Sequence, residues 1–328
     1  MKFTTIAKKS VFYMMACGFL STNIHAQVVT PSLDPTVAVV LPAAAGWRAT
    51  GGVGASYYEA SGSRKKDTGL QLHKTDTTGM NVNAAFKVGN AFIDSYFGQE
   101  TTDVQVDQYT GNINKGKDDF RINLALAGSD SVVVGLGGHN TSSYDSVDLT
   151  NDSVTTSVAR IGGSVSVKMG SVFLGGGYQR VKQNSDYQVE NTWDIATAGL
   201  AFMTGESGGT RFRVELSFAL SPHASNEIAG DLEPSEHPAT STTRYGAELM
   251  IGGLLFTYQG FNTMEVNDKP KTVDLIDYYQ IETSGSDAGV LWIPKDGLIL
   301  GFHFSSDTKT FVDNDESSAF RVNIGYLF

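Results

Sequence analysis

From residue 320 to the end of the chain, two kinds of side chain alternate, and this alternation constrains the fold more than any other feature. One side of the segment 317–328 carries Arg321, Asn323 and Gly325, whereas the other is apolar or aromatic. A period of two residues is that of a β-strand, in which successive side chains point to opposite faces. The apolar side consists of Phe320, Val322, Ile324, Tyr326 and Phe328. The sequence therefore predicts a final strand with one face in apolar surroundings.

The same alternation begins at Trp47 and recurs along the chain, which predicts fourteen strands. Short turns and long polar connections separate these strands alternately. Residues 89–90 and 252–253 contain glycine between two alternating runs, which is typical of tight hairpins. Residues 99–118 and 221–242 are examples of the long connections. The pattern does not assign the facing of the strand around residues 288–293.

The final strand resembles the C-terminal strand of Gram-negative outer-membrane β-barrels, in which a last phenylalanine preceded by alternating apolar and aromatic positions is the assembly signal. This resemblance gives Tyr326 and Phe328 that role and implies the barrel-assembly machinery as a partner. An even strand number, with short turns at one end and long loops at the other, fits such a barrel. We therefore expect an all-β fold, a transmembrane antiparallel up-and-down β-barrel of about fourteen strands formed by residues 47–328. It would lie in the bacterial cell outer membrane, against lipid and lipopolysaccharide.

A soluble β-sandwich would also show several short strands at regular spacing. The sequence lacks the cysteine pair and the buried-tryptophan pattern that would favour such a sandwich. Its hairpins have sides that are nearly all aliphatic or aromatic, and no helical segment is available to cover them. These features favour the barrel.

The N-terminus has the parts of a secretory signal peptide. Lys2, Lys8 and Lys9 precede a short apolar run at residues 11–20, and small residues lead to a cleavage site after Ala26. Residues 1–26 are therefore predicted to be a signal peptide. The segment that follows, residues 27–46, contains three of the eight prolines and shows little alternation. This N-terminal extended segment is either a periplasmic tail or a small plug inside the barrel.

Composition excludes several classes of protein. Without residues 1–26 the chain carries 24 − 3 = 21 Lys plus Arg against 35 Asp plus Glu, a formal charge of −14, and no cysteine. The only cysteine, Cys17, precedes the predicted cleavage site and matches a lipoprotein motif poorly. Disulfides are thus excluded, and the acidic balance argues against nucleic acid as a partner. The longest apolar stretch, residues 37–45, is interrupted by Pro42 and falls short of the ~20 residues of a membrane helix.

In a barrel, each strand shows one side to lipid and the other to the lumen. Lipid takes the apolar set, because a Lys or Arg facing lipid at the midplane costs roughly 2–4 kcal/mol. The polar set is therefore predicted to line the lumen, with more bases than acids. Its constriction is predicted to consist of Arg121, Arg160, Arg211, Arg213, Glu215, Arg244, Glu248 and Arg321. The rest of the predicted luminal set is Arg48, Asn81, Asn83, Lys87, Asp94, Asn123, His139, Ser164, Ser166, Lys168, Gln179, Gln259, His303 and Asn323.

Acidic residues concentrate instead in the predicted loops. Examples are Asp103, Asp107, Asp145, Asp148, Asp152, Glu227, Asp231, Glu233, Glu236, Asp274, Asp307, Asp313, Asp315 and Glu316. We expect an acidic outer mouth above a basic constriction. The luminal charges either form a polar pore whose field favours small anions, or pair with one another across the wall and merely solvate it.

No motif predicts an enzyme, a cofactor or a metal site. The His-Glu-x-x-His pattern of zinc-dependent hydrolases is absent. Outer-membrane phospholipases and lipid-A deacylases use a His and a Ser two residues apart on a lipid-facing strand end, and His139 with Thr141 is slightly similar. Thr141 stands in the Ser position, however, and the predicted register points His139 inward.

Three functions fit these observations. We expect a porin-like outer-membrane channel for passive diffusion of small hydrophilic solutes, with acidic loops and a basic lumen. The first alternative is a hydrophobic-compound transporter resembling the long-chain fatty-acid channel family, which also has fourteen strands and an N-terminal hatch. The hatch sequence of that family is not recognisable in residues 27–46, and the polar lumen argues against an oily pocket. The second alternative is a structural or adhesive barrel.

Overall fold

The computed structural model describes residues 51–65, 71–88, 91–106, 112–129, 132–147, 152–186, 190–204, 210–222, 224–226, 235–267, 279–293, 297–310 and 314–327. Several features predicted from the sequence lie outside these residues. Among them are the signal peptide 1–26, the N-terminal segment 27–46, the start of the first strand at Trp47, and the terminal Phe328.

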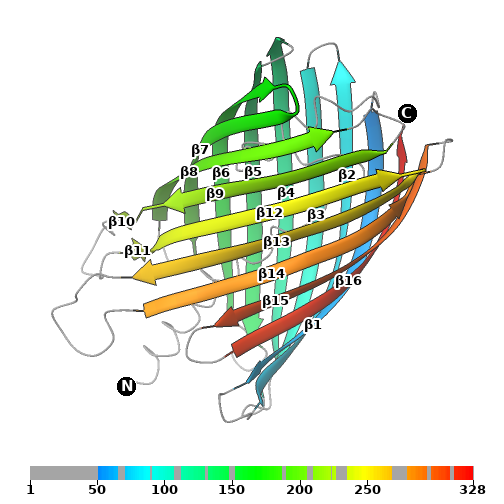
Figure 1. Cartoon of the computed structure of the whole chain (residues 1–328). Coiled ribbons are helices and arrows are strands. Elements are labelled where there is room, and N and C mark those ends of the chain that lie inside the picture. The colour runs from blue at the N-terminus through cyan, green and yellow to red at the C-terminus, as the bar shows by residue number, and fades with distance from the viewer. Residues whose placement is uncertain are drawn as a thin grey trace, which may run out of the picture.

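Within these ranges the chain folds into long antiparallel strands (Figure 1). They are β1 (Gly51–Lys65), β2 (Gln71–Val88), β3 (Ala91–Val106), β4 (Asn112–Ser129), β5 (Val132–Val147), β6 (Asp152–Met169), β7 (Val172–Ser185), β8 (Glu190–Thr204), β9 (Arg211–Ser221), β10 (Ala224–Asn226), β11 (Ser235–His237), β12 (Ala239–Ile251), β13 (Leu254–Asn267), β14 (Tyr279–Trp292), β15 (Leu298–Thr310) and β16 (Asn314–Leu327). All of them except β10 and β11 form one closed barrel of fourteen strands, which confirms the predicted fold. The strands β10 and β11 form a separate two-stranded sheet. No helix among the described residues is long and apolar enough to cross a membrane.

The last strand closes the barrel against the first. In Figure 1 the blue β1 and the red β16 lie side by side, and their antiparallel register runs without interruption from Gly52 opposite Leu327 to Lys65 opposite Asn314. A closed sheet has no edge, so each strand finds partners for its backbone N–H and C=O groups on both sides. Lipid offers no other partners for these groups, which makes closure a condition for spanning a membrane.

The strands extend well beyond the apolar alternation that predicts them. Residues 99–118 are expected to form a loop, but β3 and β4 leave only residues 107–111 between them. Most of the other long connections shorten in the same way, to residues 66–70, 148–151, 186–189, 268–278 and 311–313, whereas β9 and β12 remain separated by residues 222–238. The alternation marks only the part of a strand that faces lipid, because the backbone ladder continues where outward side chains are polar. The predicted loop lengths are therefore wrong, although the strand number is right.

The outward side chains are apolar toward one end of the barrel. This is the turn end, where residues 89–90 and 252–253 join neighbouring strands, and the opposite end is the loop end. On β16 the outward positions near the turn end are large, exposed and apolar, and Ser318 is the next outward residue toward the loop end. These apolar residues are Phe320, Val322, Ile324 and Tyr326. We call these outward apolar residues, together with their counterparts on the other strands, the apolar belt. It is the surface that the alternation predicts to contact lipid.

The strand β14 resolves the facing that the sequence leaves open. Val290 and Trp292 are exposed on the outer side, whereas Leu291 is buried on the inner side. Pairing with β15 sets Val290 opposite Phe302, which is also exposed. The apolar residues of 288–293 are therefore divided between the two faces, which is why their alternation is unclear from the sequence.

Arginine substitutions at residues 322 and 318 test how far the apolar belt extends along β16. We expect Val322→Arg to lower the free energy of unfolding by about 2–4 kcal/mol, because the guanidinium would face lipid. Ser318→Arg, on the same face of β16 but nearer the loop end, should cost no more than about 1 kcal/mol. Urea titration of the protein folded in lipid vesicles measures both values. Equal losses for the two variants would mean that the belt does not end between these positions.

Candidate functional site

The inner face of the barrel is formed by the side chains opposite the apolar belt, and most of them are shielded from water. Of the predicted luminal set, the buried members are Asn81, Asn83, Asp94, Asn123, Ser164, Ser166, Gln179, Arg213, His303, Arg321 and Asn323. The half-buried members are Arg121, His139, Arg160, Glu215, Arg244, Glu248 and Gln259, and Lys168 is exposed. Arg48 lies outside the described residues, as do the side chains of Lys87 and Arg211. Whether any of these residues forms a constriction stays a prediction.

Among the described side chains, the inner face does not carry the predicted excess of bases. Among the side chains that the structure describes, ten basic residues face inward: Arg64, Lys115, Lys117, Arg121, Arg160, Lys168, Arg213, Arg244, Lys309 and Arg321. Ten acidic residues do so as well: Asp94, Glu100, Asp119, Asp145, Glu215, Glu248, Glu265, Asp287, Asp307 and Asp315. The sequence reading ended the strands too early and left several of these acids in loops. Of the predicted loop acids, Asp103, Asp145, Asp152, Glu236, Asp307, Asp315 and Glu316 lie in strands, and the rest lie outside the described residues.

Three predicted constriction residues form one ion cluster on β9 and β12. The Arg213 guanidinium donates through Nη2 to Glu215 and through Nη1 to Glu248 Oε1, the second contact at 3.3 Å. Glu248 lies directly across the ladder from Arg213. Only 4 % of Arg213 is exposed, so this charge depends on its two carboxylate partners.

Two other predicted arginines stack on tyrosines that the sequence reading did not select. The guanidinium carbon of Arg121 lies 5.1 Å from the centroid of the Tyr96 ring. That of Arg321 lies 5.6 Å from the centroid of the Tyr58 ring. Both distances are within the range of cation–π attraction.

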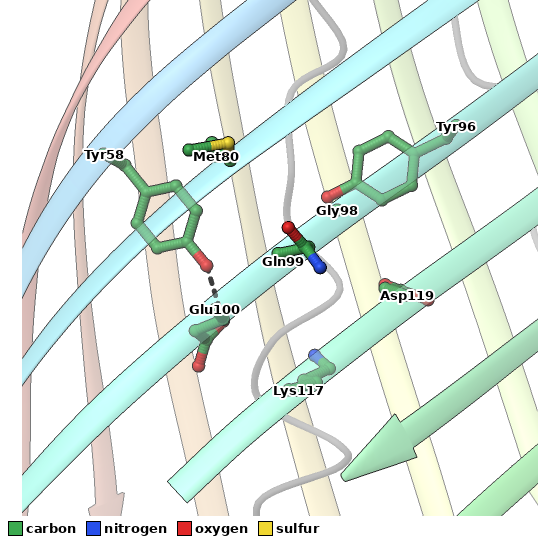
Figure 2. A pocket seen from close by; sticks show the side chains of 8 residues that line it. All are labelled: Tyr58, Met80, Tyr96, Gly98, Gln99, Glu100, Lys117 and Asp119. Atoms are coloured by element: carbon green, nitrogen blue, oxygen red, sulfur yellow. Dashed lines mark hydrogen bonds between the residues drawn. The ribbon is translucent and has the colours of Figure 1, made fainter.

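The two tyrosines border a pocket on the inner face (Figure 2). The pocket encloses about 200 Å³, part of it open to solvent, and the remaining lining residues are Met80, Gly98, Gln99, Glu100, Lys117 and Asp119. In Figure 2 the hydroxyl ends of Tyr58 and Tyr96 both point toward the space between the rings. The Tyr58 hydroxyl donates a hydrogen bond of 2.5 Å to Glu100 Oε2, which holds that ring in place.

Glycines allow both rings to lie against the wall. A Cβ atom at Gly79 would come within 2.3 Å of the Tyr58 ring. A Cβ atom at Gly98 would come within 2.6 Å of the Tyr96 hydroxyl oxygen. Any other residue at these two positions would therefore push a ring away from the wall and into the pocket.

The carboxylate of Asp119 is oriented by two neighbours on β5. The His139 ring nitrogen Nε2 contacts Asp119 Oδ1, and the Thr141 hydroxyl donates to the same oxygen at 3.2 Å. Thr141 Oγ1 also lies 3.3 Å from His139 Nε2. A nucleophile, base and acid in relay would use opposite nitrogens of the histidine, whereas Thr141 and Asp119 here share one. The predicted inward facing of His139 is confirmed, and this arrangement positions a carboxylate.

A similar pair lies on the other side of the barrel. His303 Nδ1 and Asp287 Oδ1 are 2.8 Å apart, and both side chains are almost fully buried. The imidazole lies over Gly289, where a Cβ atom would come within 2.4 Å of it. This pair does not line the tyrosine pocket.

Near the turn end the inner face becomes apolar. Leu255, Leu291 and Ile299 form one buried cluster, and Ile299 has no exposed surface. Phe173 and Ala201 form a second cluster, also buried. The inner wall thus combines ionic residues over most of its height with apolar side chains near the turn end.

The sequence reading missed Tyr58, Tyr96, Glu100 and Asp119. The sequence does contain a signal for the two tyrosines. Tyr58 and Tyr96 lie at positions between outward-facing residues, in strands where inward and outward side chains alternate. Glu100 falls in the segment 99–118, which was predicted to be a loop, and Asp119 directly follows that segment, so the true strand ends were needed to place both side chains. Among the described residues, no group of three or more His, Cys, Asp or Glu side chains could hold a metal ion.

The predicted assembly signal is described only in part. Tyr326 faces outward near the end of β16, with 49 % of its surface exposed, and pairs with Val53 and Leu298. Phe328 lies outside the described residues. Recognition of this strand by the barrel-assembly machinery stays a prediction.

Comparison with known proteins identifies the fold. No protein-family model matches the sequence, and no curated protein matches it. The solved structure of the Ralstonia pickettii toluene transporter TbuX is similar, with 9% identity, coverage of 92% of this chain and 96% of that chain, and a TM-score of 0.54. The CymD monoaromatic hydrocarbon channel is also similar, with 9% identity, coverage of 90% and 91%, and a TM-score of 0.51. At this identity the likeness shows a shared fold, that of outer-membrane β-barrels.

The Arg213 cluster allows a test of how the inner wall is held together. Changing both Glu215 and Glu248 to Gln leaves a buried guanidinium without a compensating charge, and we expect the free energy of unfolding to fall by about 3–5 kcal/mol. Urea titration in vesicles, followed by tryptophan fluorescence, measures this loss. The matched control is Asp194→Asn, which removes the partner of the exposed Arg180 and should leave the unfolding midpoint almost unchanged. A midpoint that the double variant also leaves unchanged would contradict a structural role for the cluster.

Proposed function

We propose that this protein is an outer-membrane transporter through which small hydrophobic compounds pass along the inside of the barrel. The fold is shared with a toluene transporter and a monoaromatic hydrocarbon channel over nearly the whole of each chain. The proposal includes export by the N-terminal signal peptide, insertion through the signal at Tyr326 and Phe328, and contact with lipopolysaccharide.

The observation that carries this proposal is the burial of the inner face. A wide water-filled channel would leave the lumen-facing side chains hydrated. Here, Asn123 and Asn323 on the inner wall are each only 1 % exposed, although both are polar. A wall so shielded from water favours a narrow or closed path over free aqueous diffusion.

The apolar clusters at the turn end support the same proposal. Leu255, Leu291 and Ile299 face the interior, where the wall of a general diffusion pore would be polar. An apolar surface lowers the free energy of a hydrophobic solute relative to water. Such a solute leaving the barrel at the turn end would cross a surface of this kind.

A second candidate is the porin-like channel for small hydrophilic solutes. The observation in its favour is the number of charged groups on the inner face, including Lys115 and Asp145 in an ion pair of 3.3 Å. Charged walls are typical of aqueous pores. Acids and bases are equal in number among the described inward side chains, so these residues give no reason to expect anion preference.

Solute flux separates these candidates. We expect proteoliposomes that hold the mature protein to take up toluene faster than vesicles without protein, because the barrel offers a path around the polar headgroups. The same vesicles should swell no faster in L-arabinose than protein-free vesicles, and planar bilayers should show no large steady conductance. Vesicles with heat-denatured protein are the control. Rapid arabinose entry with a steady open conductance would favour the porin-like channel, and absence of both fluxes would favour a structural barrel.

A further inference from the structure

The inner wall at the turn end holds an apolar cluster close to the first strand. Leu255, Leu291 and Ile299 lie on β13, β14 and β15, and all three are buried. Ile299 pairs across the ladder with Gly325 on β16, and Gly325 pairs with Gly54 on β1. Both glycines are buried on the inner face. These two positions therefore place no side chain between β1 and the cluster.

Two buried asparagines lie beside the glycines. Asn83 pairs with Gly54 in the β1–β2 ladder, and Asn323 lies two residues before Gly325 on β16. The exposed fraction is 4 % for Asn83 and 1 % for Asn323. Among the described residues, neither side-chain nitrogen has a hydrogen-bond partner, and nor does the side-chain oxygen of Asn323. A buried amide without a partner is costly, so these atoms favour an occupant that can bond to them.

The cluster and the asparagines together define the chemistry of an occupant. The cluster favours apolar side chains, because these gain free energy by leaving water there. The asparagines favour hydrogen-bond donors and acceptors, and a peptide group offers one of each. A small hydrocarbon satisfies the first requirement alone. A peptide segment with apolar side chains satisfies both.

The chain carries such a segment directly before β1. Residues 27–46 contain one charged side chain, that of Asp34, and an apolar run of Val, Ala, Val, Val and Leu at residues 37–41. Prolines at positions 31, 35 and 42 disfavour a regular helix or a central strand. The peptide groups of this segment therefore depend on partners elsewhere, such as the two asparagines.

The connection to β1 is long enough for this run to reach the cluster. Its last residue precedes Gly51, the first residue of β1, by 51 − 41 = 10 positions. A chain of this length extends over at most roughly 33–36 Å. The cluster lies two to four strands from β1 around the barrel. Neighbouring strands are about 4.8 Å apart, so four spacings amount to about 20 Å.

We propose that the run 37–41 docks inside the barrel on the apolar cluster of Leu255, Leu291 and Ile299. The residues between this run and β1 lie along the two glycines, and their backbone groups bond to Asn83 and Asn323. The segment thereby covers the apolar part of the inner wall and closes the turn end to water. This inference goes beyond the proposed transport function and does not depend on it.

Engineered disulfides in the full chain test where the run lies. The mature protein carries no cysteine, and a disulfide forms only where two Cα atoms lie within about 7 Å. Val39→Cys combined with Leu291→Cys should form an intrachain disulfide under mild oxidation in vesicles, with loss of both free thiols. The matched control is Val39→Cys combined with Val290→Cys, because residue 290 adjoins residue 291 but faces outward. This control should keep both thiols free.

Three outcomes of the cross-linking would overturn the proposal. Equal cross-linking of residue 39 to residues 290 and 291 would indicate a free tail. Absence of a disulfide to residue 291 from each of residues 37, 39 and 41 would exclude docking on the cluster. A disulfide between Val39→Cys and Ala201→Cys would place the run on the second apolar cluster instead.

Charged substitutions in the same run test whether it closes the turn end. Val37→Asp combined with Val39→Asp would set two carboxylates against the apolar cluster, and should turn a low conductance in planar bilayers into a steady one. Thr30→Asp combined with Ser32→Asp is the control, because it adds the same charge to the segment outside the run. A variant in the run that conducts no more than this control would contradict closure. Toluene uptake without the disulfide to residue 291 defeats the docking alone, and the disulfide without toluene uptake defeats the transport function alone.

Discussion

Every part of this structure depends on the pairing of the first barrel strand with the last. In lipid, a backbone N–H or C=O group has no water to bond, so an open sheet edge would cost several kcal/mol for each unpaired group. The β1–β16 ladder removes both of the edges that an open row of these fourteen strands would leave. Once the sheet is closed, each residue must face either lipid or the interior, and the period of two decides which. The belt, the ionic wall and the pocket all follow from this division.

The interior shows how a barrel accommodates charge. Arg213 has two carboxylates within reach, Asp119 has His139 and Thr141, and Asp287 has His303. Burying a charge without a partner is far more costly than burying it with one. Ionic groups can thus occupy a shielded wall because their partners lie nearby, on the same strand or on the neighbouring one. The charges of the inner wall are compensated locally, group by group. The net charge of this wall is therefore a poor guide to the solute that the barrel admits.

The sequence predicted the fold well because lipid imposes a strict rule on one face. Alternation from Phe320 to Tyr326 is enough to place a strand, and the same rule places its neighbours. Beyond the lipid-facing part of a strand the alternation stops, and the sequence therefore predicts a loop at 99–118, which includes Glu100 and ends just before Asp119, although the ladder continues through both residues. The pocket was unpredictable for a further reason. Tyr58, Tyr96 and Asp119 come from three different strands, and only the register brings them together.

The polar continuation of the strands gives the molecule a rigid collar beyond its apolar belt. Several neighbouring strands are joined there by few residues, such as 66–70, 107–111 and 311–313. A ladder of backbone hydrogen bonds opens only cooperatively, so it offers proteases few sites. A binding protein that approaches this end would meet side chains displayed by several strands at fixed spacing. Its target would be a folded surface assembled from distant parts of the chain, which a peptide copied from any one segment would fail to reproduce.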